Sequence, residues 1–145
     1  MAPDEWDRIE AACMRLQRRY GTLADRQDPA FRELFTADAV IELPEYPPFS
    51  GIDAIMAAQA QWKASGVVMR HVSTNFTIDI VDAENAKGLC YLMVFHHAPL
   101  SSPSTSPQPS LPVSLGEFHD TFVKSEGRWL FKRRKLIRVF RGFAD

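Results

Sequence analysis

Apolar and polar residues alternate with a helical period over residues 4–26. Apolar side chains recur every three or four positions, which places them in one stripe along a helix. The stripe consists of Trp6, Ile9, Cys13, Leu16, Tyr20 and Leu23. Asp4 and Glu5 stand in the first turn, where acidic side chains complement the helix dipole. The pattern predicts a long helix whose stripe carries the Tyr20 hydroxyl toward the core.

A second, shorter helix is predicted to follow directly. Asp28 and Pro29 have the residue types of an N-cap and a first helical position, and the pattern stops near Phe35. An apolar run at residues 39–43 then predicts a strand. The following segment PEYPPFSG contains three prolines, so it is expected to be irregular.

A third helix is predicted after this proline-containing segment. Ser50 can cap its first turn, and Gly66 is placed to end it. A helical period again brings apolar residues to one face of this segment. The residues that share the face are Ile52, Ile55, Met56, Gln59 and Trp62.

From residue 67 onward the hydrophobic period becomes strand-like. The segments 67–81, 87–97, 113–124 and 128–140 are predicted as strands because they are rich in β-branched and aromatic residues. The segment 99–112 is rich in proline and serine with little apolar content, which predicts a mobile hairpin loop. Helices followed by a run of antiparallel strands indicate an α+β layer fold.

Composition narrows the class of protein. With 145 residues and 46% hydrophobic content, the chain is expected to form one domain, residues 1–145. A net charge of −1 gives no general attraction to nucleic acid or to anionic membranes. Two cysteines are too few for a disulfide framework, and no apolar run approaches the ~20 residues of a membrane span. A soluble, cytoplasmic protein without nucleic-acid or membrane partners is expected.

Asp25 and His71 are the strongest candidates for chemistry. A carboxylate bonded to one imidazole nitrogen fixes the tautomer and raises the basicity of the other nitrogen. Tyr20 could donate to a carbonyl oxygen and stabilise developing enolate charge. Five residues rotate about 500° on an ideal helix, so Tyr20 and Asp25 would point about 140° apart. The helix must therefore end or distort near Asp25 if both are to reach one pocket. The alternative is that all three residues are structural.

Further along the chain the candidates are weaker. Asn75 shares strand parity with His71 and could orient a substrate oxygen, but apolar residues alternate on the opposite parity. Either a polar-faced pocket or a bulge that switches faces would fit. His96 and His97 are neighbours on a strand, so only one of them can face a pocket. Glu117 and His119 have metal-ligand spacing without a third ligand; no metal and no cofactor are expected.

The segment YGTLADRQDPAFRELFTADAVIE, together with His71, resembles the SnoaL-like branch of the nuclear transport factor 2-like superfamily, to which the scytalone and bile-acid dehydratases are related. The resemblance implies a cone, in which a strongly curved, antiparallel or mixed sheet wraps the long N-terminal helix around a deep pocket. It also implies catalytic roles for Tyr20, Asp25 and His71. In the segment GEFHDTFVKSEGRWLFKRR, which resembles the last hairpin of the family, Phe118 replaces a common tyrosine and Arg134 occupies a position that often reaches the pocket.

These observations favour a cofactor-independent lyase of the dehydratase type, or an isomerase, acting on a hydrophobic carbonyl, ring or polyketide-type compound. Tyr20, Asp25 and His71 would be catalytic, and the substrate contacts would be Asn75, His96, Phe118 and Arg134. A non-catalytic ligand-binding or accessory subunit, resembling the small subunits of ring-hydroxylating dioxygenases, is the alternative. Epoxide hydrolysis would need a carboxylate beside Arg134, for which Asp120 is the candidate. A homo-oligomer, dimer or trimer, is expected because an open curved sheet leaves one apolar face.

Overall fold

A computed structural model describes residues 2–97 and 114–141 of the chain. Helices predominate in the N-terminal part of the chain. The helices are α1 (Pro3–Arg26), the short 3₁₀ helix η1 (Pro29–Leu34) and α2 (Ile52–Ala64). Asp28 caps η1 as expected, since its carboxylate accepts a hydrogen bond from the Ala30 N–H at 2.8 Å. The helix α2 differs in one detail from the prediction, because its N-cap is Gly51 and Ser50 belongs to the preceding strand.

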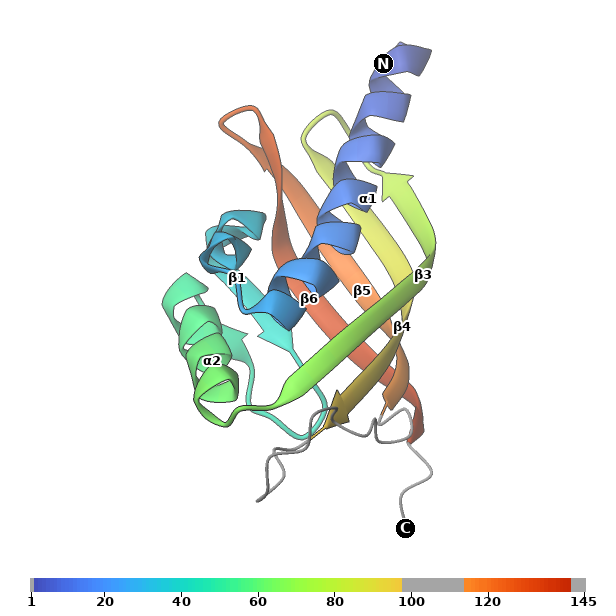
Figure 1. Cartoon of the computed structure of the whole chain (residues 1–145). Helices are drawn as coiled ribbons and strands as arrows, with labels where there is room; N and C mark the ends of the chain where they lie inside the picture. The colour runs from blue at the N-terminus through green and yellow to red at the C-terminus, as the bar shows by residue number, and fades with distance from the viewer. Residues whose placement is uncertain (1, 98–113, 142–145) are drawn as a thin grey trace.

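Six strands form one mixed sheet in the order β2-β1-β6-β5-β4-β3 (Figure 1). They are β1 (Phe35–Glu42), β2 (Phe49–Ser50), β3 (Val68–Ile80), β4 (Asn85–His97), β5 (Ser114–Ser125) and β6 (Arg128–Arg141). All neighbours pair antiparallel except β1 and β6, which are parallel. The α+β class and the long N-terminal helix against a curved sheet are confirmed. The predicted hairpin loop at 99–112 lies outside the described residues.

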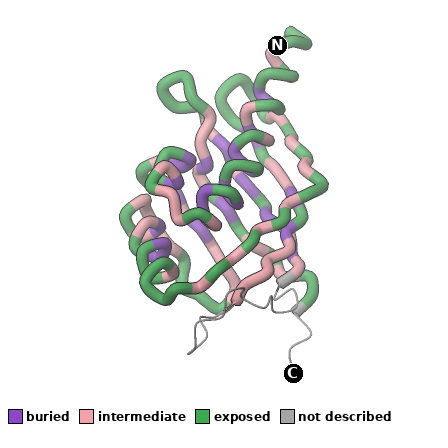
Figure 2. The backbone as a smooth tube through the Cα atoms, in the orientation of Figure 1, coloured by how far each residue is buried: buried purple, intermediate pink, exposed green. Residues whose placement is uncertain are grey.

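The helix α1 crosses one face of the sheet and supplies a large part of the core (Figures 1 and 2). Its buried stripe begins at Ile9, whereas Trp6 at the outer end is 46% exposed. Buried positions of the stripe meet the inward-facing side chains of β4, β5 and β6. One polar residue, Gln17, is fully buried among them. The stripe predicted from the sequence is therefore correct except at its first residue.

A β-bulge in β3 decides which side chains of that strand face the helix. The register with β4 shifts between Thr74 and Thr77, and Asn75 has a φ of 53°. Asn is among the few residues that tolerate this left-handed backbone region. Because a bulge adds one residue, side-chain parity changes across it. The half-buried residues of β3 therefore all lie on the inner face, and exposed residues separate them. They are Met69, His71 and Ser73 before the bulge, and Phe76, Ile78 and Ile80 after it. Of the two possibilities left open by the sequence, the structure has the bulge.

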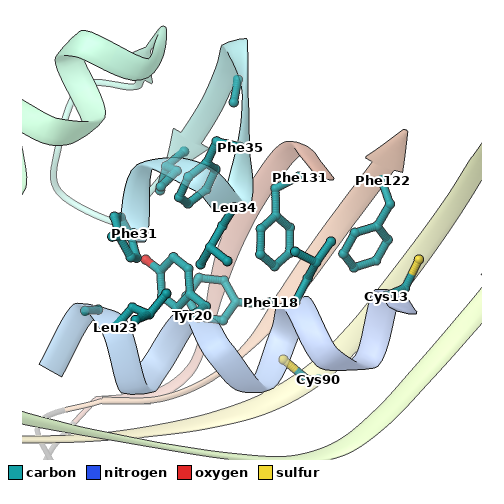
Figure 3. Packing of buried hydrophobic residues seen from close by; sticks show 14 of the residues in the cluster. Cys13, Tyr20, Leu23, Phe31, Leu34, Phe35, Cys90, Phe118, Phe122 and Phe131 are labelled. Atoms are coloured by element: carbon teal, nitrogen blue, oxygen red, sulfur yellow. The ribbon is translucent and has the colours of Figure 1, made fainter. Parts of the chain in front are cut away.

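Aromatic rings occupy the centre of the core, between α1 and the sheet. Figure 3 shows the Tyr20 ring among Phe31, Phe35, Phe118 and Phe131. The ring centroids of these four phenylalanines lie 5.1–6.2 Å from that of Tyr20. Such tilted and edge-to-face pairs add to the stabilisation that comes from burying their area. This packing fixes Tyr20 in one orientation before any ligand binds.

Candidate active site

The strand β3 passes over α1 at Gly21, and this crossing positions His71. A Cβ atom added at Gly21 would lie 3.0 Å from the His71 Cβ and 3.5 Å from the His71 carbonyl oxygen. The strand could not approach the helix so closely if residue 21 had a side chain. Glycine inside a helix costs roughly 0.5–1 kcal/mol relative to alanine, so its presence here is explained by the close approach. The sequence contained this signal, a glycine within a helical pattern, but Gly21 was not singled out.

Asp25 binds His71 through both carboxylate oxygens. Oδ1 lies 2.5 Å from the imidazole Nδ1, and Oδ2 accepts a hydrogen bond from the His71 backbone N–H at 2.8 Å. The side chains of His71 and Asp25 are 11% and 10% exposed. An ionised carboxylate can only accept, so the pair requires a proton on Nδ1 and leaves Nε2 as the basic nitrogen of the neutral ring.

The helix reaches this geometry without a break at Asp25. It continues to Arg26 and ends at Gln27, which adopts a left-handed conformation with a φ of 52°. Gly21 and Asp25 are four residues apart and therefore lie on the same helix face. Tyr20 lies beside that face, next to Gly21 in the sequence. His71, which packs against Gly21, therefore contacts both Asp25 and Tyr20. Of the two expected possibilities, an end or a distortion near Asp25, the structure has the end, and the strand crossing above Gly21 brings His71 to both residues.

Tyr20 contacts the imidazole edge-on and stays protonated over the whole physiological range. The ring centroids of Tyr20 and His71 are 5.9 Å apart at an interplanar angle of 86°. Burial raises the pKa of the Tyr20 hydroxyl to about 12, although the nearby Arg134 guanidinium acts in the opposite direction. A neutral phenol beside a basic imidazole can donate a hydrogen bond to a ligand oxygen.

A cavity of about 130 Å³ opens beside these residues. Its polar side chains are those of Tyr20, His71 and Gln59. The remaining lining is apolar and comes from Ala24, Leu43, Trp62, Met69, Leu92, Val94, Phe118 and Leu136. Tyr20, Gln59 and Trp62 also line a smaller hollow that continues toward β1 and β2. Sequence reasoning placed Gln59 and Trp62 on one face of α2 but assigned neither of them to the site.

Arg134 was expected at the pocket, but the structure places it in a buried ion pair. Its Nε and Nη2 donate to the two oxygens of Asp120 at 2.8 and 3.1 Å, and Gln17 donates to the same carboxylate at 3.0 Å. The guanidinium carbon lies 3.8 Å from the Phe118 ring centroid and 4.1 Å from that of Tyr20. Arg134 is 1% exposed and lies outside the lining of the cavity. The carboxylate that epoxide hydrolysis would require is beside Arg134, but the pair is buried away from the ligand space.

The other expected substrate contacts lie in different places. Phe118 lines the cavity as expected. Asn75 is exposed at the bulge and does not share the face of His71. His96 has the strand parity of Leu92 and Val94 and pairs in register with Met69, so it faces the cavity side at the end of β4. His97 therefore has the opposite orientation.

Another histidine contacts a carboxylate outside the cavity. His119 Nε2 lies 3.0 Å from Glu117 Oε2. Both residues lie on the outer face of β5. Among the residues the structure describes, no group of three or more His, Cys, Asp or Glu side chains is placed to hold a metal ion. Within the same part of the chain, no helix is long and apolar enough to cross a membrane.

Solved structures share this architecture. A candidate scytalone dehydratase from Novosphingobium aromaticivorans aligns with a TM-score of 0.83 and 22% identity, over 99% of this chain and 93% of that chain. A hexachlorocyclohexane dehydrochlorinase, LinA type 2, aligns with a TM-score of 0.82 and 14% identity, over 99% and 94%. An NTF2-like protein with a cystatin-like fold from N. aromaticivorans has a TM-score of 0.70 and 24% identity, over 92% and 82%. At these identities the likeness establishes the fold.

Sequence comparison gives the family. A search of curated protein sequences finds no match. The profile of the SnoaL-like domain, in contrast, matches residues 8–135, which include most of α1, the Asp25–His71 pair and most of the sheet. The chain belongs to the SnoaL-like domain family, as the segment from Tyr20 to Glu42 and the position of His71 indicated.

Proposed function

We propose that the protein is a cofactor-independent lyase of the dehydratase type, or an isomerase, that acts on a small hydrophobic carbonyl compound. The observation that carries the proposal is the double contact between Asp25 and His71 beside an apolar cavity. The base, the residue that orients it and the hydrogen-bond donor are all side chains of this chain. The proposed chemistry therefore needs no added group.

The reaction begins with transfer of a proton from the carbon next to the substrate carbonyl to Nε2 of His71. Negative charge then develops on the carbonyl oxygen, where the Tyr20 hydroxyl donates a hydrogen bond. Asp25 stabilises the imidazolium through Nδ1–H. In a dehydration, the imidazolium returns its proton to a β-hydroxyl group, which leaves as water while the carbon–carbon double bond forms. In an isomerisation, the proton returns to another carbon.

The names of two structural neighbours support this class of reaction for the fold. One is a candidate dehydratase and the other a dehydrochlorinase, so both names denote loss of a small molecule from a substrate. The cavity is lined mainly by apolar side chains, which suits a hydrophobic ring. The non-catalytic alternative is disfavoured, because a binding subunit has no need for the Asp25–His71 hydrogen bonds.

The test is turnover per folded molecule on a panel of small cyclic β-hydroxy ketones such as 3-hydroxycyclohexanone, whose dehydration product absorbs ultraviolet light. The His71→Ala variant should retain its fold and lose activity. His119→Ala is the matched control, since His119 also contacts a carboxylate but lies on the outer face of the sheet. Equal turnover by wild type and folded His71→Ala would overturn the proposal.

A homo-oligomer, dimer or trimer, is part of the proposal. Apolar side chains are exposed on the outer face of several neighbouring strands. They include Val72, Tyr91, Ile137 and Phe140, which are 39–61% exposed. Exposed apolar patches of this kind mark interaction surfaces. Light scattering at micromolar concentration should give a mass above the 16.4 kDa of one chain, and the monomer mass would contradict it.

A further inference from the structure

Gln59 is the polar residue of the cavity to which the acid–base proposal gives no role. It lies on the inner face of α2, next to the buried Ala58 and one turn after the buried Ile55. Its side chain lines both the main cavity and the smaller hollow beside it. The residue is only 7% exposed. Within the described part of the chain, its Oε1 atom is buried without a hydrogen-bond donor.

A buried amide oxygen without a protein donor is costly, because it loses its hydrogen bonds to water and gains none in return. An apolar side chain of similar size would pack on Ile55, Ala58 and Trp62 without that cost. Gln59 thus destabilises the empty protein, and its position on the cavity wall points to a compensating contact. We propose that Gln59 binds the ligand, by accepting a hydrogen bond from a hydroxyl or N–H group that the ligand carries.

The inference narrows the ligand class. A cavity of about 130 Å³ resembles in size the engineered ~150 Å³ cavity that binds benzene, so a single ring would fill it and contact both Gln59 and His71. The ligand is therefore a ring compound with a hydrogen-bond donor on the side that meets α2. A site built to bond such a donor rejects analogues that lack it, because the buried acceptor is then left unpaired. The inference uses the cavity of the proposed function but not its chemistry.

Phenol and toluene test the inference, since they have nearly the same shape and differ in a hydroxyl against a methyl group. Binding is measured by calorimetry or by chemical shifts of the cavity residues. Wild type should bind phenol about tenfold more tightly than toluene, the effect of one buried hydrogen bond. In Gln59→Met, which conserves volume, the preference should disappear or reverse. Gln61→Met is the matched control, because Gln61 lies on the exposed face of the same helix.

Thermal unfolding supplies the second measurement. Gln59→Met removes the unpaired acceptor, so its melting temperature should rise by about 2–4 °C. A phenol preference that persists in folded Gln59→Met, or wild type that binds neither probe, would overturn the inference. A lower melting temperature with an unchanged preference would also do so, because Gln59 would then be structural. None of these results depends on turnover, so a failure of His71→Ala to lose activity would leave the Gln59 result standing.

Discussion

Two acid–base pairs lie within the same cone and have different surroundings. Asp25 and His71 retain about a tenth of their side-chain exposure, and His71 lines the cavity. Asp120 and Arg134 have side-chain exposures of 0% and 1%, and the Arg134 guanidinium stacks on the Tyr20 and Phe118 rings. Each carboxylate accepts two hydrogen bonds from its cationic or basic partner. The two pairs therefore differ in access to a ligand rather than in the number of bonds.

The difference teaches which charges can take part in a reaction. A histidine that borders a cavity can exchange a proton with a ligand through its second nitrogen. A guanidinium held in a bidentate pair donates two N–H groups to its carboxylate, and its buried contacts fix the core. It also lies 4.1 Å from the Tyr20 ring centroid, so the buried pair packs against the ring of the proposed donor. From the sequence, Asp25, His71 and Arg134 were expected at one pocket, with Asp120 only a candidate partner of Arg134; the structure buries Arg134 with Asp120 outside the cavity lining.

Substitution of Asp25 or His71 should have the largest effect on turnover. Asp25→Asn and His71→Ala should each lower turnover per folded molecule by about 10²- to 10⁴-fold, the usual contribution of a positioned acid or base. The double variant should be little worse than either single one, because the two residues act as a unit. Folded fractions are measured by circular dichroism in parallel.

If the two residues were only structural, activity would fall in step with the folded fraction instead. Multiplicative losses in the double variant would also show that the residues act independently, and would contradict the dyad.

Disruption of the buried pair should change stability and not chemistry. Arg134→Leu leaves the Asp120 carboxylate buried without its partner, so the free energy of unfolding should fall by about 3–5 kcal/mol in urea titration. The neighbouring pair Arg133–Glu42 lies at the surface, and Arg133→Ala should cost at most about 1 kcal/mol. If folded Arg134→Leu lost turnover as fully as His71→Ala, Arg134 would belong to the reaction.

Tyr20 connects the two regions, and a smaller effect is expected for its hydroxyl. Its pKa is about 12 in the folded protein and about 10 when exposed, so between these values the folded state holds a proton that the unfolded state has released. Stability from this group is therefore complete below pH 10 and is lost as the pH rises through 12, by about 3 kcal/mol.

Tyr20→Phe should remove this part of the alkaline decline and should lower turnover less than either dyad variant. Urea titrations of both proteins across this pH range measure the difference. Identical declines in wild type and Tyr20→Phe would contradict the raised pKa of the phenol.

Local patterns in the sequence predicted the elements well, because helical and strand periods depend on neighbouring residues. The bulge in β3 was left open, since a one-residue insertion depends on the pairing partner and not on the strand alone. Asn75 gave the available signal, an Asn in a run of strand residues that tolerates positive φ. Asn75 was instead expected to be a substrate contact, because it shares strand parity with His71 in an unbulged strand.

The candidate site was predicted in part. Tyr20, Asp25 and His71 come together, and Phe118 lines the cavity. Gln59 was not predicted as a site residue, because tertiary packing brings α2 to the cavity. A hydrophobic period within one segment does not indicate which other segments it contacts. Arg134 was expected at the pocket from the family resemblance, which gives neither the depth of a side chain nor its partner in this chain. Asp120, one strand away, captures its guanidinium.

The tautomer of His71 tests the dyad most directly and needs no substrate. Long-range ¹⁵N NMR distinguishes a protonated ring nitrogen from an unprotonated one. In the neutral ring, the proton should be on Nδ1, bound to Asp25, with Nε2 unprotonated toward the cavity. Asp25→Asn should weaken this preference, while Glu117→Gln beside His119 should leave it unchanged. A neutral His71 with its proton on Nε2 would contradict the dyad, because that nitrogen could not then accept a proton from a substrate.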